Sequence, residues 1–154
     1  MNKLMPALAG AALLGAGVPA TSASAQDAAL RATYATIRLV SGFQPDPWWV
    51  PVQSGGNIDA AKLNGCRGMV SAAPDVELSY TAGSLPLYLQ TFSSSDTTLV
   101  VNGPDGRWYC DDDSGGGTNA RLIFQRPQSG TYDIWIGSFG GGIHDAQLRV
   151  SEVR

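Results

Sequence analysis

The chain is short of imidazole and thiol groups, with one His and two Cys in 154 residues. Zinc is held by three or four His, Cys or carboxylate ligands, so two separate cysteines and one His make a poor zinc site. A nucleophilic thiol needs a basic partner, and His144 is the one imidazole in the sequence. His144 has Asp145 beside it in a Gly-rich segment, but no Gly-x-Ser-x-Gly motif supplies a nucleophile. We therefore expect no catalytic site and predict that the protein is not an enzyme.

Positive charge is also scarce. Ten Lys and Arg stand against 13 Asp and Glu, and the basic residues are scattered singly. Nucleic acids and anionic membranes require clustered Lys and Arg, so we expect neither as the main partner. The run Gly140–Gly142 is not followed by Lys-Ser/Thr, which excludes a phosphate-binding loop of the P-loop kind.

Long hydrophobic runs are absent except at the N-terminus. Lys3 is followed by the apolar, Gly-containing stretch Leu4–Val18 and by Ala23-Ser24-Ala25, a small-x-small cleavage site. The stretch is too short for a stable membrane span. We predict a signal peptide over 1–25, cleavage after Ala25, a secreted or periplasmic protein, and no transmembrane segment. Removing Lys3 from the ten basic residues leaves nine against 13 acidic ones, a mature net charge of about −4.

The two cysteines, Cys66 and Cys110, form an even pair in a chain predicted to be exported. Such pairs favour a disulfide over a metal pair or a catalytic thiol. A loop of this length corresponds to about 4 kcal/mol of stabilisation by loop-closure entropy.

Alternation of apolar and polar residues dominates the mature chain and predicts β-strands with one buried face. Gly and Pro breakers separate the runs, so we expect an all-β fold, an antiparallel β-sandwich or jelly roll. We assign 26–45 to an N-terminal lead-in and 46–154 to the sandwich, and Asp27–Thr33 is the one plausible helix start, of one or two turns. The expected strands are 35–40, 48–53, 66–71, 76–81, 86–92, 97–102, 107–110, 120–125, 131–138 and 146–152.

The apolar members of these alternating pairs form the predicted core of the sandwich. They are Leu78, Tyr80, Leu87, Leu89, Leu99, Val101, Leu122, Phe124, Ile134, Ile136, Leu148 and Val150.

The acidic run Asp111-Asp112-Asp113 directly follows Cys110 and is the strongest candidate for a ligand site. Adjacent carboxylates repel one another, and a hard cation such as calcium relieves that repulsion through oxygen ligands. Asp96 and Asp105 come from adjoining loops and complete a possible calcium set. In an extended chain Asp111 and Asp113 share one side and Asp112 faces the other. The alternative is a solvated acidic turn, because the chain has no EF-hand spacing.

Four tryptophans are candidates for either core or recognition. Trp48, Trp49 and Trp108 are possible binding residues, because exposed Trp rings stack on sugars or hold protein partners. Trp135 falls out of phase with the apolar face of its strand. We expect three of the four in the core, and Trp48 and Trp49 on opposite sides of an extended segment.

The order of several motifs resembles the bacterial pre-peptidase C-terminal domain family. The matching elements are Asp96–Leu99, Pro104–Gly106, Asp112-Asp113 and Ser129–Ile136. The resemblance covers about 57–152 and implies a β-sandwich found beside secreted peptidases, without catalytic residues of its own and with calcium or polymer binding in some relatives. This chain departs from the pattern in carrying no attached peptidase and in its Cys pair, which suggests a distinct stand-alone subgroup.

Three functions remain open on these grounds. The leading interpretation is an exported binding or accessory module whose partner is a secreted peptidase or an extracellular polymer, with protein or polysaccharide recognition and weak calcium binding. The alternatives are an envelope protein that associates with itself through sheet edges or apolar patches, and a small secreted hydrolase. No cofactor other than calcium is suggested.

Overall fold

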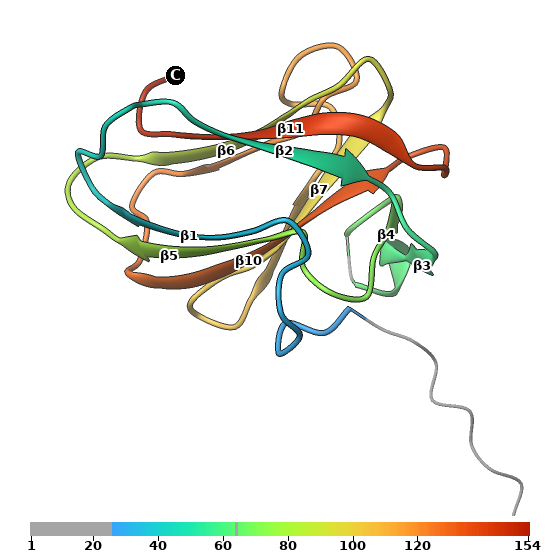
Figure 1. The fold of residues 1–154 in the computed structure, drawn as a ribbon, viewed down its shortest axis with the longest axis horizontal. Helices are drawn as coiled ribbons and strands as arrows, with labels where there is room; N and C mark the ends of the chain where they lie inside the picture. Colours follow the sequence, from blue (N-terminus) through green and yellow to red (C-terminus); the bar gives the residue numbers. More distant parts are fainter. Residues whose placement is uncertain (1–25, 64) are drawn as a thin grey trace, which may run out of the picture.

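Two β-sheets stacked face to face form the body of the protein, as a computed structural model describing residues 26–63 and 65–154 shows (Figure 1). Sheet A has seven strands in the order β1-β5-β10-β4-β3, and in addition β7 pairs β10 and β8 pairs β7. Sheet B has four strands in the order β2-β11-β6-β9. The fold is therefore the predicted all-β sandwich. The strands are β1 Ala35–Val40, β2 Trp48–Ser54, β3 Ile58–Asp59, β4 Met69–Val70, β5 Val76–Thr81, β6 Leu87–Phe92, β7 Thr97–Asn102, β8 Trp108–Asp111, β9 Arg121–Phe124, β10 Gly130–Ser138 and β11 His144–Ser151.

The main core lies between the two sheets and contains the residues that the alternation predicted. Ten of the twelve predicted core residues are buried, and Leu122 and Phe124 on β9 are partly buried and pack against the others. Alternate residues of each strand point inward because side chains in a strand alternate between faces. The predicted register is thereby confirmed.

One strand pair departs from the antiparallel expectation. β1 pairs β5 in parallel, from Ala35 opposite Val76 to Val40 opposite Thr81. β1 and β5 can run in the same direction because β2, β3 and β4 lie between them in the chain, a crossover far longer than a hairpin turn. β1 falls within 26–45, the range assigned to a lead-in, so part of that range belongs to sheet A.

A segment between β2 and β5 covers part of the outer face of sheet A. It carries β3, β4 and a single 3-10 turn, Ala60–Lys62. Its apolar side chains form a second, smaller core with Val100 of β7 and Trp135 of β10, both fully buried. Trp135 is out of phase with the main core because it belongs to this second one.

The expected strand over 66–71 is wrong: only Met69–Val70 is extended and paired. Gly65 and Gly68 have positive φ values of 88°, which bend the chain away from a strand. Cys66 is buried in the second core. The segment adds only the two short strands β3 and β4 to the edge of sheet A, and the rest of it covers part of the outer face of the sheet.

The expected helix at Asp27–Thr33 is also wrong. Residues 28–30 form a turn, closed by the amide of Leu30 donating to the carbonyl of Asp27. The Asp27 side chain accepts from the amide of Ala29, which favours a turn over a helix.

Within the described residues, no helix reaches the length and apolarity needed to cross a bilayer. The signal peptide predicted over 1–25 lies outside those residues.

Candidate functional site

The predicted disulfide is present between Cys66 and Cys110, with the two Cα atoms 5.2 Å apart. It ties the covering segment to β8 at the outer face of sheet A. Neither cysteine is a free thiol, so neither is a nucleophile. His144 begins β11, and its Nε2 lies 3.1 Å from the carbonyl oxygen of Gly141.

The β7–β8 hairpin brings three of the five candidate calcium ligands together. The two strands pair antiparallel with Leu99 opposite Asp111, so the residues after β8 run back toward the start of β7. Asp96, Asp112 and Asp113 thus meet, and one carboxylate oxygen of each lies within 4.8 Å of the others. β8 ends at Asp111, so the extended alternation that would separate Asp112 from Asp113 does not apply.

Mutual repulsion and burial act on this cluster of Asp96, Asp112 and Asp113. Burial, followed by the charge of Asp113, raises the pKa of both Asp96 and Asp112. Arg67 on the covering segment opposes the shift at Asp112. One buried oxygen of Asp96 and one of Asp112 have no hydrogen-bond partner. The three carboxylates together therefore carry more negative charge than the one nearby base, Arg67, can neutralise.

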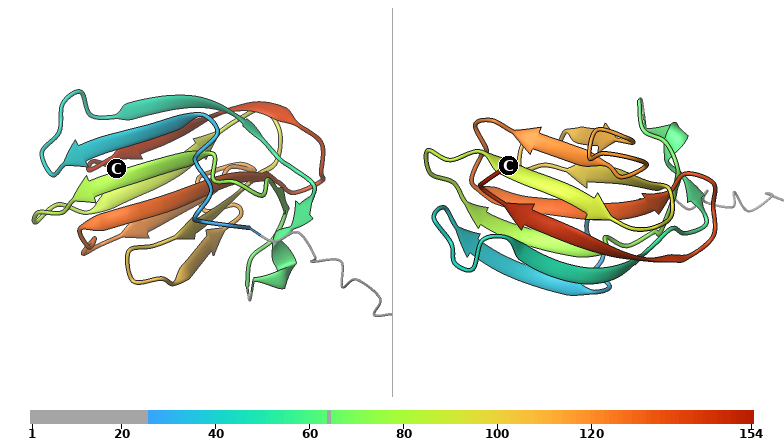
Figure 2. Two further views of the ribbon diagram at one scale, coloured as in Figure 1. Left: turned by 60° about the horizontal axis from the view of Figure 1, so that its bottom comes forward. Right: turned by 90° about the horizontal axis from the view of Figure 1, so that it is seen from above.

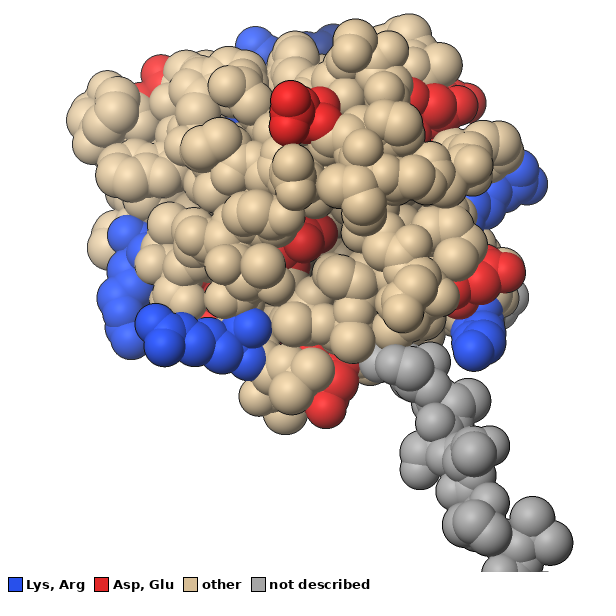
Figure 3. All heavy atoms as spheres, turned by 45° about the vertical axis from the view of Figure 1, so that its right-hand side comes forward, with Lys and Arg blue, Asp and Glu red and all other residues tan. Residues whose placement is uncertain are grey.

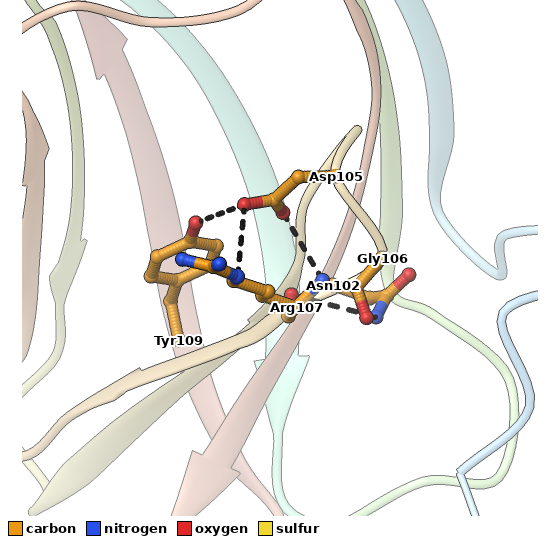
Figure 4. A network of polar contacts seen from close by, with 5 residues as sticks. All are labelled: Asn102, Asp105, Gly106, Arg107 and Tyr109. Carbon is orange, nitrogen blue, oxygen red and sulfur yellow. Dashed lines mark hydrogen bonds and ion pairs between the residues drawn. The ribbon is translucent and has the colours of Figure 1, made fainter.

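Asp105 lies at the other end of the hairpin and does not join the cluster. Figure 4 shows it among its own contacts, with Arg107 and Tyr109. Six residues of β7 separate the two ends, about 20 Å of extended chain. Its carboxylate accepts from the Tyr109 hydroxyl at 2.7 Å and from the Arg107 amide at 3.0 Å. The Tyr109 bond, more than any other contact, lowers the pKa of Asp105. Asp105 is a turn residue of the hairpin.

Asp111 is also occupied by a structural role. Its carboxylate accepts from the amide of Ser114 at 2.9 Å, the hydroxyl of Ser114 at 2.6 Å and the amide of Arg121 at 2.8 Å. These bonds connect the end of β8 to the start of β9, where the chain passes from sheet A to sheet B. The candidate calcium set therefore reduces to Asp96, Asp112 and Asp113.

The three candidate binding tryptophans have different surroundings. Trp108 is partly buried and lies 5.3 Å from Trp135, ring centre to ring centre, so it belongs to the second core. Trp48 is partly buried against the main core. Trp49, the next residue along β2, points the other way and is 43% exposed. Trp49 alone of the three is available for recognition.

Trp49 is part of an aromatic patch on the outer face of sheet B. Its ring packs edge to face on Phe92 of β6 with 5.1 Å between centroids, and Phe92 is itself 38% exposed. A shallow groove of about 300 Å³ runs beside this pair and is lined by Pro51, Phe92, Asp145 and Gln147 among others. We call Trp49, Pro51, Phe92, Asp145 and Gln147 the sheet B patch. Viewed from above in Figure 2, β11 and β6 lie at the front of the molecule, and the C-terminal end of the chain reaches over one end of β6.

A second, larger cavity of about 540 Å³ lies where β2 leaves sheet B for the covering segment. Its lining includes Tyr34, Gln53, Ser71, Asp75 and Ile143. Figure 3 shows the right-hand side of the molecule as drawn in Figure 1, where separate acidic and basic side chains stand among uncharged residues. Asp75 is only 2% exposed, and burial raises its pKa to about 7. Asp75 follows Pro74, one of the breakers between the alternating runs, and no sequence pattern indicates this cavity.

Comparison with known proteins gives little further guidance. No family model matches the sequence, and no curated protein matches it. Among solved structures the chain is similar to the crystal structure of Aeromonas hydrophila PliG, a periplasmic lysozyme inhibitor of g-type lysozyme. That similarity has a TM-score of 0.40 and 14% sequence identity, and it covers 75% of this chain and 96% of the other.

Proposed function

We propose that this protein is an exported, non-catalytic binding module that recognises a neutral polysaccharide through the sheet B patch. The observation that carries the proposal is the exposed Trp49–Phe92 pair on the outer face of sheet B. The disulfide supports export, because such bonds persist in oxidising compartments.

The chemistry of the patch favours a sugar chain. Pro51, Trp49 and Phe92 offer apolar surface for the C–H faces of pyranose rings. Asp145 and Gln147 line the adjoining groove and offer acceptors and donors for hydroxyl groups. An acidic chain repels polyanions, so a neutral polymer fits better than an anionic one.

The resemblance to the pre-peptidase C-terminal domain family extends the proposal to an accessory role. A binding module of this kind would hold a separately encoded secreted enzyme, such as a peptidase, near its polymer. This part rests on the order of motifs from Asp96 to Ile136.

The test is a depletion assay on a panel of insoluble polymers: cellulose, chitin, xylan and peptidoglycan. We expect retention on at least one, and at least a tenfold loss of affinity, about 1.4 kcal/mol, in the double variant Trp49→Ala/Phe92→Ala. Phe139→Ala is the matched control, since Phe139 is an exposed aromatic residue in the segment after β10, outside the patch. Equal retention of the double variant, or retention on none of the polymers, would refute the proposal. Concentration-dependent dimerisation lost in the double variant would instead assign the patch to self-association.

We also propose that Asp96, Asp112 and Asp113 bind calcium weakly and thereby order the loop between β8 and β9. The supporting observation is the convergence of three carboxylates, two of them with a buried oxygen that no protein donor satisfies. Oxygen ligands at such spacing suit calcium, and waters would complete its six to eight ligands.

A further inference from the structure

A buried carboxyl group at a gap in sheet A suggests a second ligand site. β10 pairs first with β5 and then with β4, and Asp75 stands just before β5 where the partner changes. Its Oδ2 accepts from the amide of Ile136 at 2.7 Å. Neither β5 nor β4 offers a backbone carbonyl to this amide, so the Asp75 side chain takes the place of a backbone hydrogen bond of the sheet. This contact accounts for one oxygen of Asp75 and has a purely structural role.

The other oxygen, Oδ1, lacks a good donor. The nearest is the hydroxyl of Ser71 at 3.4 Å, but that hydroxyl also lies 2.7 Å from the carbonyl of Ala73. A serine hydroxyl has a single proton, and the shorter contact takes it. When Asp75 is ionised, its Oδ1 therefore has no hydrogen-bond donor of its own. This is costly because the residue is only 2% exposed and water cannot readily supply one.

No basic residue balances this carboxylate among the residues that line the cavity. Beyond the lining, the neighbouring elements carry acids, Glu77 on β5 and Asp133 on β10, and Tyr34 stands at the rim. They also carry bases: Arg31 before Tyr34, Arg38 on β1 and His144 at the start of β11. None of these bases is among the groups that shift the pKa of Asp75, which are burial, the Ile136 amide and Ser71. Burial, above all other causes, raises the pKa of Asp75 to about 7.

We propose that the cavity between β2 and the covering segment binds an ammonium or guanidinium group, which pairs with Asp75. A cation supplies both the missing donor to Oδ1 and the missing countercharge, the two conditions under which a buried charge is tolerated. Tyr34, 42% exposed at the rim, presents a ring to the same cation. The cavity of about 540 Å³ has room for the group and several attached carbons. The group can belong to a small amine or to a Lys or Arg side chain of a protein.

The experiment uses the mature protein and isothermal titration with two probes, methylguanidinium and the blocked peptide acetyl-Gly-Arg-Gly-amide. Acetyl-Gly-Gln-Gly-amide is the uncharged control and must bind at least tenfold more weakly than the Arg peptide. Affinity is expected to be about 30-fold weaker at pH 5.5 than at pH 8, the ratio of ionised Asp75 for a pKa of about 7. Comparable affinities of methylguanidinium and the Arg peptide indicate a small-molecule ligand, and at least tenfold tighter binding of the peptide indicates a protein side chain.

Asp75→Asn is the matched variant, because its amide oxygen can still accept from Ile136 while the charge is lost. It should abolish binding, whereas Asp133→Asn, which removes another buried carboxyl outside the cavity lining, should not. In the wild type, carboxyl carbon NMR should show the pKa of Asp75 falling when methylguanidinium is added. Binding that survives Asp75→Asn, binding independent of pH, or no binding of either cationic probe would overturn the proposal.

Discussion

The acidic residues at strand ends differ in burial, hydrogen bonding and pKa according to how each strand ends. Asp75, Asp111 and Asp105 are all acidic, yet one is buried against a backbone amide, one connects two sheets and one closes a hairpin. Burial raises the pKa of Asp75, while donors from Tyr109 and Arg107 lower the pKa of Asp105. Local geometry, more than residue type, therefore decides which carboxylates are free for a ligand.

Asp75 predicts a dependence of stability on pH. Its pKa is about 7 in the folded protein and 3.8 as its ordinary value, so folding favours the protonated form. The stabilisation is fully present below about pH 4 and is lost as the pH rises through about 7. The free energy of unfolding should fall by about 2 to 3 kcal/mol between pH 5 and pH 8 through this group.

Urea denaturation at pH 5 and pH 8 measures this fall. Asp75→Asn should remove most of it, and Asp105→Asn, whose carboxyl shifts in the opposite direction, should leave it in place. The same slope in wild type and Asp75→Asn would mean that another group carries the pH dependence.

At the scale of elements, the covering segment and the strand pairing explain what sequence patterns missed. Period-two alternation predicted the long strands because each buries one face in the main core. The segment between β2 and β5 shows no alternation of apolar and polar residues. Its apolar side chains pack one by one on the outer face of sheet A, and they do not form one face of a long strand. In an antiparallel β7–β8 hairpin, Asp105 lies at the turn, and the residues after β8 lie beside the start of β7. This register alone places Asp105 and the acidic cluster at opposite ends of the hairpin. The burial of Asp75 depends on where β10 changes partners, which no local pattern encodes.

Gly137 tests the packing of the covering segment on β10. A Cβ atom there would lie 2.2 Å from Thr98 Oγ1 and 3.0 Å from Val70 Cγ1. Gly137→Ala should therefore lower the free energy of unfolding by about 1 to 3 kcal/mol through overpacking. Gly140→Ala is the matched control, since its Cβ meets nothing within 4 Å, and should change stability by no more than about 0.5 kcal/mol. Equal thermal melts for the two variants would contradict this account of the second core.

At the scale of the whole molecule, the two sheets have different outer faces. The covering segment and the disulfide Cys66–Cys110 close part of the outer face of sheet A, while sheet B keeps the exposed Trp49–Phe92 pair. The acidic cluster lies where the chain leaves β8 for β9. The molecule thus presents three separate candidate surfaces: the sheet B patch, the acidic cluster and the cavity at Asp75.

Calcium should raise the melting temperature of the whole domain if the acidic cluster binds it. An ion present at 100 times its dissociation constant stabilises the folded state by about 2.7 kcal/mol, which corresponds to several degrees for a domain of this size. Thermal melts in millimolar calcium and in chelator measure the difference. It should vanish in Asp112→Asn/Asp113→Asn and persist in Asp105→Asn. Identical melts of the wild type with and without calcium would leave a solvated acidic turn as the better description.

The central claim is recognition through the outer face of sheet B. Its most direct test is NMR mapping with soluble oligosaccharides of whichever polymer retains the protein. The account predicts that amide and indole shifts change along β2, β11 and the end of β6, with Trp49, Phe92 and Gln147 among the strongest. Changes confined to the cavity at Asp75, to the β7–β8 hairpin or to sheet A, with the Trp49 indole unmoved, would contradict it.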